Sequence, residues 1–445
     1  MYPSTEPIIH WHPKAAGRPD SSVLLMTVSR GDGGFRLARS DGWVFVALLL
    51  GIVAIGEALK VFRAPALLPI VLVAVIYARG SMFRRQHLPL LLLSIWGLIY
   101  VFLSYLHAFS PAWTRYYDTG VIFQQASYLA VLLPLVSASQ KWWDDPRFDV
   151  NREAILIAVV FFAFLFGVAL DIAILGAEGV SIRPLATLRN YVLLGLLALS
   201  YFAFRSRKWR TFAIAALMLL LAMSIWLHLF LQNTFVYVII LGFLTVAMLR
   251  IPADRLMLAV FLLLLISVTL IGIQDPLRVF EIDPNTGWRL AWWRDALEAT
   301  AQTGGLGVGY GTESLRNEYG STLLRDTYRE EGGTFLLVST HSAFFDTIFR
   351  TGVVGFVLLC VVLARCYPHA HTPPLARAHC CAMFAVMILC LHSNLGLQSP
   401  MYSLGVAICI GYLQSERRKA VVAASRAAVD VPIGTPREAA SLARQ

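Results

Sequence analysis

The sequence predicts an all-helical membrane protein with about twelve transmembrane helices and one large periplasmic loop. Hydrophobic residues make up 58% of the chain and charged residues only 14%, whereas roughly 25% of the residues in a soluble domain are charged. The apolar residues occur in long blocks, and the basic residues gather in short clusters between these blocks. A chain of this kind lacks the polar residues to cover its surface in water, so lipid is the solvent that fits.

Each apolar block of roughly 20 residues is long enough to cross a bilayer as a helix. We place the spans near residues 43–59, 65–78, 88–109, 119–138, 155–176, 190–205, 211–228, 231–249, 256–274, 342–364, 378–392 and 398–414. The second span is the least clear, and the seventh and eighth could instead form one bent span.

The basic clusters set the orientation of the spans. Most of the 37 Lys and Arg residues fall in connections that are cytoplasmic if the N-terminus is inside, such as Arg205–Arg210 and Arg417–Lys419, as the positive-inside rule requires. Both ends are therefore expected in the cytoplasm, as tails covering 1–41 and 415–445. Nine helices fall within 42–274 and three within 342–414. No cleavable signal peptide is expected, because the first 40 residues lack an early apolar core.

The net charge of +10 could indicate binding to nucleic acid, but no soluble segment is long enough to form a basic face, so no nucleic-acid partner is expected. The six cysteines have no metal-ligand spacing and lie in or beside apolar blocks, which predicts small buried side chains without disulfides.

Residues 275–341 form the one long polar segment, and loops of this length are usually functional or disordered. Within it, Trp288–Leu297 has helical spacing with aromatic residues, which predicts a helix lying on the membrane interface. Turn formers flank this helix at Asp283–Asn285 and Gly304–Gly305. Any chemistry is expected in this segment.

A histidine motif closes the segment: His341-Ser342, nine residues, and then Gly352 and Gly355. A histidine at the water boundary of a spanning helix can accept a proton near pH 7. Taken alone, such a residue is more often a simple helix cap. The two glycines allow a neighbouring helix to approach closely.

The spacing of this motif resembles the signature of the bacterial O-antigen ligase and O-antigen polymerase family. Upstream, Gly287–Leu297 followed by Gly305–Gly309 is similar to the family's loop segment. The two matches run from residue 287 to about 365, and the twelve-helix layout agrees with them. The resemblance implies a GT-C-like membrane fold.

The resemblance also implies a function. These enzymes transfer a glycan from undecaprenyl diphosphate to a sugar hydroxyl on the periplasmic side of the bacterial inner membrane, without a metal or a cofactor. The partners implied are the lipid-linked glycan, an acceptor that is lipid A-core or a second lipid-linked repeat, and membrane lipid. Ligase and polymerase differ only in that acceptor, and the spacing slightly favours the ligase.

The resemblance and the chemistry together suggest the site residues. Guanidinium groups suit a diphosphate leaving group because they bind phosphate oxygens in a bidentate manner. We therefore expect His341 as general base and Arg289 and Arg189 at the diphosphate. Further substrate contacts are expected from Arg183, Asn190, Trp292, Arg294 and Ser342, with Arg350 as another alternative. Each arginine could instead be an interfacial cation on lipid phosphates.

Two other kinds of site were considered. Gly304–Gly311 could form a backbone nest for diphosphate oxygens, although a plain turn is the simpler interpretation. Paired acids that would hold a catalytic metal are represented only by Glu281 and Asp283, so no metal is expected. His392 and His228 are expected to be structural.

The alternatives from other classes are a transporter or flippase and a non-catalytic assembly subunit. Ion-coupled carriers need ionisable groups at the membrane midplane, but Glu57, Asp171 and Asp346 lie near predicted helix ends. The halves of the chain also show no repeat, so transport is the less favoured interpretation.

Overall fold

The computed structural model describes residues 67–109, 119–145, 254–311, 340–393 and 400–429, together with 211, 214 and 215. The chain divides into two compact units, Met1–Arg39 and Ser40–Gln445, and every described residue belongs to the second. Within these residues all regular elements are helices, which confirms the predicted all-helical class.

All of the main helices except α10 and α11 overlap the predicted apolar blocks. They are α2 (Leu67–Ala78), α3 (Leu88–Tyr105), α4 (Thr119–Asp144), α9 (Asp254–Gln274), α10 (Pro276–Ile282), α11 (Pro284–Gln302), α13 (Ala343–Ala364), α14 (Pro374–Ser393) and α15 (Pro400–Val429). Two short 3-10 turns, Arg79–Ser81 and Arg85–His87, connect α2 to α3.

Four of the described helices are long and apolar enough to cross a membrane: Arg85–Tyr105, Arg255–Gln274, Ala343–Ala364 and Pro374–His392. They coincide with the spans expected at 88–109, 256–274, 342–364 and 378–392. The spans expected at 43–59, 155–176, 190–205 and 231–249, and all but three residues of 211–228, lie outside the described residues. The count of twelve therefore stays a prediction.

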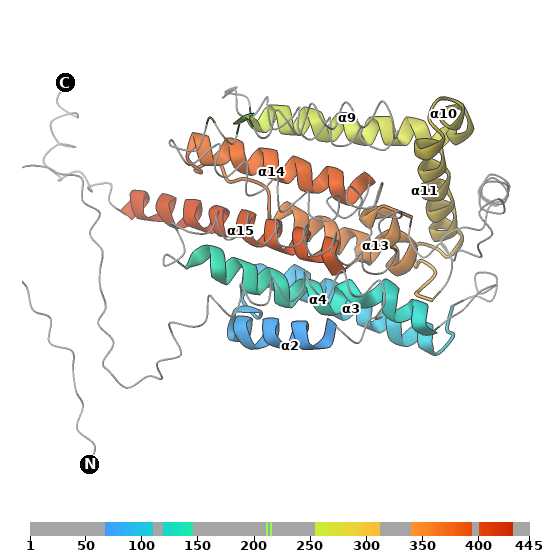
Figure 1. Cartoon of the computed structure of the whole chain (residues 1–445), viewed down its shortest axis with the longest axis horizontal. Coiled ribbons are helices and arrows are strands. Elements are labelled where there is room, and N and C mark those ends of the chain that lie inside the picture. Colours follow the sequence, from blue (N-terminus) through green and yellow to red (C-terminus); the bar gives the residue numbers. More distant parts are fainter. Residues whose placement is uncertain are drawn as a thin grey trace, which may run out of the picture. The chain divides into compact units, whose positions relative to one another are not determined.

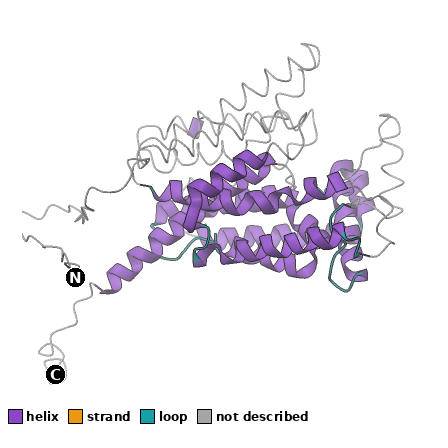
Figure 2. Cartoon of the chain, turned by 90° about the horizontal axis from the view of Figure 1, so that it is seen from below, coloured by secondary structure: helices purple, strands orange, loops and turns teal. Residues whose placement is uncertain are grey.

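The spanning helices run side by side, and α11 lies across their direction (Figure 1). Helix α4 packs against α2, α3 and α15, while α13 packs against α3, α11 and α14. Helix α14 also contacts α9 and α15. The view from below shows the same side-by-side arrangement of the described helices (Figure 2).

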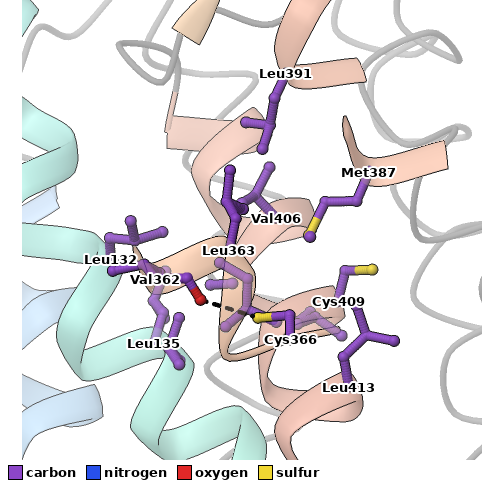
Figure 3. Close-up of a cluster of buried hydrophobic side chains, with 14 of the residues drawn as sticks. Leu132, Leu135, Val362, Leu363, Cys366, Met387, Leu391, Val406, Cys409 and Leu413 are labelled. Atoms are coloured by element: carbon purple, nitrogen blue, oxygen red, sulfur yellow. Dashed lines mark hydrogen bonds between the residues drawn. The ribbon is translucent and has the colours of Figure 1, made fainter. Parts of the chain in front are cut away.

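A cluster of buried apolar side chains joins α4, α13, α14 and α15 (Figure 3). Its labelled members are Leu132, Leu135, Val362, Leu363, Cys366, Met387, Leu391, Val406, Cys409 and Leu413. The Cys366 thiol donates to the Val362 carbonyl at 3.5 Å. All six cysteines are free, and all but the partly buried Cys360 are buried, so their prediction as small apolar side chains holds.

The end of α13 remote from His341 is tied to α15. The Arg417 guanidinium donates to the carbonyl oxygens of Ala364 at 3.1 Å and Tyr367 at 3.2 Å, so it caps the C-terminus of α13. Arg418 forms an ion pair with Asp144 at 2.9 Å. Helix α15 continues to Val429, so the first part of the tail predicted at 415–445 is helical and extends the last predicted span.

The helix expected at 288–297 is present and longer, because α11 begins at Pro284. A short helix that the sequence did not predict, α10, precedes it. The side chain of Asp275 accepts the backbone N–H of Arg278 at 3.2 Å and so caps α10. A Cβ atom on Gly287 would lie 2.4 Å from the Phe280 Cα. Only glycine therefore lets α10 and α11 meet this closely.

Candidate active site

The candidate site lies where α11 crosses the start of α13. Helix α11 supplies Arg289, Trp292 and Trp293, and the turn before α13 supplies His341. Trp292 and Trp293 are both buried, at 4% exposure. They belong to an apolar cluster with Leu290 and Ile273. The helix is thus anchored by its aromatic face, which fixes the positions of the polar residues beside that face.

His341 has an unusual backbone conformation. Its φ angle is +57°, in the left-handed region that costs an L-residue roughly 1–2 kcal/mol. Its imidazole stacks on the Trp292 indole, with the ring centroids 5.4 Å apart and the planes 18° from parallel. Strained backbone of this kind concentrates at functional sites, where the surrounding structure holds it. The strained backbone and the stacked imidazole therefore make His341 a candidate for a functional role, which stays a prediction.

Side chains hold the peptide groups of Thr340, the residue before this histidine. The Thr340 N–H donates to Oδ1 of Asp346 at 2.7 Å. Its carbonyl accepts the Trp293 indole N–H at 3.0 Å. The Ser342 carbonyl accepts the first hydrogen bond of α13, from the Asp346 N–H at 2.8 Å. The Ser342 side chain is fully buried, and its hydroxyl donates to the Leu391 carbonyl at 3.5 Å. This contact indicates a packing role.

Arg289 and His341 lie beside the same pair of tryptophans. Arg289 precedes Trp292 and Trp293 by three and four residues, so all three share one face of α11. The positive charge of Arg289 interacts electrostatically with the His392 imidazole. The His392 ring in turn packs edge-on against Trp293, with the ring centroids 4.7 Å apart. The arginine and the candidate base are therefore brought to one region.

His392 is the residue at this site that sequence reasoning assigned no part. Its Nε2 lies 2.8 Å from the Thr269 hydroxyl, which itself donates to the Leu265 carbonyl at 2.7 Å. The hydroxyl oxygen therefore accepts from the imidazole, so Nε2 carries a proton. In the sequence, His392 stands out only by its place at the end of a spanning helix. That position alone does not distinguish a histidine of the site from a structural one.

Arg294 points away from Trp292. Two residues along a helix correspond to a rotation of about 200°, and the Arg294 side chain pairs with Glu298 at 2.9 Å. It also donates to the Gln274 carbonyl, at 3.5 Å. The structure thus separates Arg294 from His341, with which the sequence grouped it.

The glycine-rich segment 304–311 is a tightly bound turn. Its backbone N–H groups donate, from Gly304 to Gly311 in order, to Ala301 O, Thr300 O, Thr303 O, Thr303 Oγ1, Phe349 O, Arg350 O, Ser104 Oγ and Gln125 Oε1, at 2.7–3.3 Å. A nest binds an anion through several unused N–H groups. Because protein acceptors take all of these, the turn interpretation is the correct one.

This segment lies on a kink in α13. Gly352 has φ 69° and ψ −169°, a conformation available essentially to glycine alone. The kink exposes the Thr351 carbonyl to the Trp96 indole N–H at 3.0 Å, and it lets Gly305 O accept the Val353 N–H at 2.9 Å. The predicted close approach at Gly352 is thus made by this loop and not by a helix.

Arg350 is enclosed by the same contacts. Its side chain is 2% exposed, and Nη1 donates to the Gly309 carbonyl at 3.3 Å. The carboxylate of Asp346, one helical turn earlier, interacts with it electrostatically. A guanidinium bound in this way fastens the glycine-rich segment to α13. These contacts indicate a structural role, and the diphosphate contact considered for Arg350 stays a prediction.

We expect Arg350→Ala to destabilise the protein by about 3–5 kcal/mol, because it leaves the buried Asp346 carboxylate without its opposing charge. Arg294→Ala removes an exposed pair of about 0.5 kcal/mol and is the matched control. Thermal unfolding of the two purified variants in detergent measures the difference. Equal melting temperatures would contradict the structural role of Arg350.

The predicted site residues therefore fall into three groups. His341, Trp292, Ser342 and Arg289 are brought together, and Arg294 is turned away. Arg183, Arg189 and Asn190 lie outside the described residues, so their roles stay predictions. Among the residues that are described, no group of three or more His, Cys, Asp or Glu side chains could hold a metal ion.

Residues 185–360 match the family model described as O-antigen ligase. The matched range contains Arg189, Arg289 and His341, and it begins two residues after Arg183. A search of curated proteins found none that matches the chain.

Proposed function

Since residues 185–360 place the chain in the O-antigen ligase and polymerase family, we propose that it transfers a glycan from undecaprenyl diphosphate to a sugar hydroxyl. The transfer takes place on the periplasmic side of the bacterial inner membrane and uses no metal. The observation that carries this proposal is that His341 stacks on Trp292, while the charge of Arg289, one turn earlier on α11, acts on the His392 ring that packs against the neighbouring Trp293.

The reaction breaks the bond between the sugar and the diphosphate, so negative charge develops on the phosphate oxygens. A guanidinium stabilises that charge, especially where water is excluded. We assign this role to Arg289 on α11, with Arg189 as the second cation. Asn190 follows Arg189 directly in the chain, and Arg183 precedes it by six residues. We expect both to contact the same substrate.

The acceptor hydroxyl must lose a proton as it attacks the sugar. His341 is the proposed general base, since a neutral imidazole accepts a proton near pH 7. Trp292 would support the imidazole face, and Ser342 would hold the turn. Arg294 is bound to Glu298 and would contact substrate only by breaking that pair.

The test is the surface glycan of a strain that lacks the gene, complemented with wild type, His341→Ala or Arg289→Ala and examined on a gel. The wild type restores the glycan and neither variant does. Full rescue by both variants would refute the mechanism. The same reaction with purified protein is expected to continue in EDTA, and inhibition reversed by a divalent cation would refute the metal-free route.

The gel also separates the two members of the family. Accumulation of carrier-linked polymer without attachment to lipid A in the deletion strain identifies a ligase, which we favour. A shift to single-repeat glycan identifies a polymerase. The two outcomes follow from the acceptor alone, because the donor chemistry is shared.

Two arginines of α11 provide a matched comparison. We expect Arg289→Lys to lower glycan transfer by about 10- to 100-fold, since an ammonium cannot bind two phosphate oxygens in parallel. Arg294→Lys should retain transfer within about threefold, because an exposed ion pair contributes little. Initial rates of the purified variants measure both effects. Equal rates for the two variants would remove Arg289 from the diphosphate site.

A further inference from the structure

We propose that Asp346 and Trp293 are positioning residues that fix the His341 imidazole by holding the peptide groups of Thr340. The inference rests on the proposed function insofar as His341 is the base. Its structural content is independent of that function: two side chains from different helices bind the N–H and the C=O of one residue, and the next residue is the strained histidine.

The Asp346 contact acts on the Thr340 N–H. The carboxylate is 7% exposed, and Thr340 is fully buried, so water does not compete for the 2.7 Å hydrogen bond. A hydrogen bond to a charged acceptor is stronger than one between neutral groups. Asp346 also makes the first backbone hydrogen bond of α13, since its own N–H donates to the Ser342 carbonyl at 2.8 Å. The turn is therefore closed on both sides of His341 by one residue.

Asp346 is itself held in place by a buried polar group of residues. Its charge acts on Arg350, Tyr128 and Tyr310, and the two tyrosine hydroxyls lie 3.1 Å apart. Burial raises the pKa of the Tyr310 phenol well above its ordinary value, so this hydroxyl remains protonated. The carboxylate that binds the Thr340 N–H thus lies among buried polar groups, with the Arg350 guanidinium as its counter-charge.

The Trp293 contact acts on the Thr340 carbonyl. The indole is stacked on Phe345, with centroids 4.7 Å apart and planes within 7° of parallel, and His392 packs against it edge-on. Because α11, α13 and α14 all contribute to this group, the N–H that meets the carbonyl at 3.0 Å cannot move by itself.

The effect of the two contacts is to fix the direction of the His341 side chain. With both peptide groups of Thr340 held, the chain enters His341 in one orientation, and the left-handed φ then turns the imidazole onto Trp292. Removal of either contact lets φ relax toward ordinary values, which unstacks the ring. A misplacement of about 1 Å at a reacting group can cost roughly 100-fold in rate.

The test uses full-length purified Asp346→Ala, Asp346→Asn and Trp293→Phe proteins, with Asp144→Asn and Trp143→Phe as controls. The control residues are an acid and a tryptophan at the far end of α4, where Asp144 pairs with Arg418. Two quantities are measured: the rate at which diethyl pyrocarbonate modifies His341, followed by mass spectrometry, and the kcat and KM of transfer from a polyprenyl-diphosphate glycan.

We expect Asp346→Ala and Trp293→Phe to raise the modification rate at His341 at least threefold and to lower kcat by about 10- to 100-fold, with KM within twofold. Asp346→Asn keeps an oxygen acceptor for Thr340, so it should restore both quantities to within about threefold of wild type. Because it removes the charge opposite Arg350, it should still melt at a lower temperature than wild type. The two controls leave the modification rate unchanged.

The proposal is overturned if diethyl pyrocarbonate modifies His341 at the wild-type rate in both Trp293→Phe and Asp346→Ala. It is also overturned if the control substitutions raise that rate equally. These outcomes leave the glycan transfer of the wild type untouched. Absence of transfer by the wild type would instead refute the proposed function, and the modification rates would still decide whether the two residues position His341.

Discussion

His341→Asn should abolish glycan transfer without loss of the fold. Asparagine is among the residues that tolerate the left-handed region, so it can keep the φ of +57°. Its amide cannot accept a proton near pH 7. A general base contributes about 100- to 10,000-fold to a rate, and the loss should lie in that range, in kcat. The measurement is the initial rate of the purified variant against wild type.

A glycine at the same position separates the loss of the general base from the effect of the strained backbone. His341→Gly relieves the strain, so it should melt at or above the wild-type temperature and yet be as inactive as His341→Asn. His371→Ala, which changes an exposed histidine between α13 and α14, should be fully active. If either His341 variant retained transfer within about threefold, His341 would not be the base.

Gly352→Ala should destabilise the protein strongly. A Cβ atom at this position would lie 2.3 Å from the Gly305 carbonyl oxygen and 2.6 Å from the Leu306 carbonyl carbon. Both are backbone atoms of a segment bound at every N–H, so they cannot move aside. Strain and overpacking together should cost at least about 3 kcal/mol. In detergent, this corresponds to a fall in the melting temperature of at least about 3 °C.

Gly80→Ala is the matched control, because a Cβ atom there would meet nothing within 4 Å. It should leave the melting temperature unchanged or slightly higher. If Gly352→Ala were as stable as Gly80→Ala, the glycine-rich segment would not be in contact with α13 at Gly352.

The sequence predicted the spanning helices well because length and apolar composition are local properties. Helices α3, α9, α13 and α14 begin and end within a few residues of the predicted spans. It did not predict α10, since seven residues give too little periodicity to detect. It also ended α15 too early, because the polar residues after Gln414 are stabilised by contacts with other helices, such as that of Arg417 with Ala364.

At the site, residue type and spacing identified His341, Arg289 and Trp292. A two-residue spacing on a helix implies that Arg294 and Trp292 point in different directions. The sequence did not show which of the two directions leads to His341. The left-handed φ of His341 was beyond prediction, because it depends on Asp346 and Trp293, which bind Thr340 from separate helices. Such non-local contacts leave no signal in a single sequence.

The hydrogen bonds of residues 304–311 have a consequence for how this region can vary. Its first N–H groups bind within the end of α11, and its last reaches Gln125 of α4, so the number of residues between these points is set by geometry. One inserted residue would displace every later donor from its acceptor. Although it has no regular repeat, this stretch tolerates changes of length no better than the interior of a helix does. Any adaptation of the protein to a differently shaped saccharide must therefore be sought in other parts of the chain.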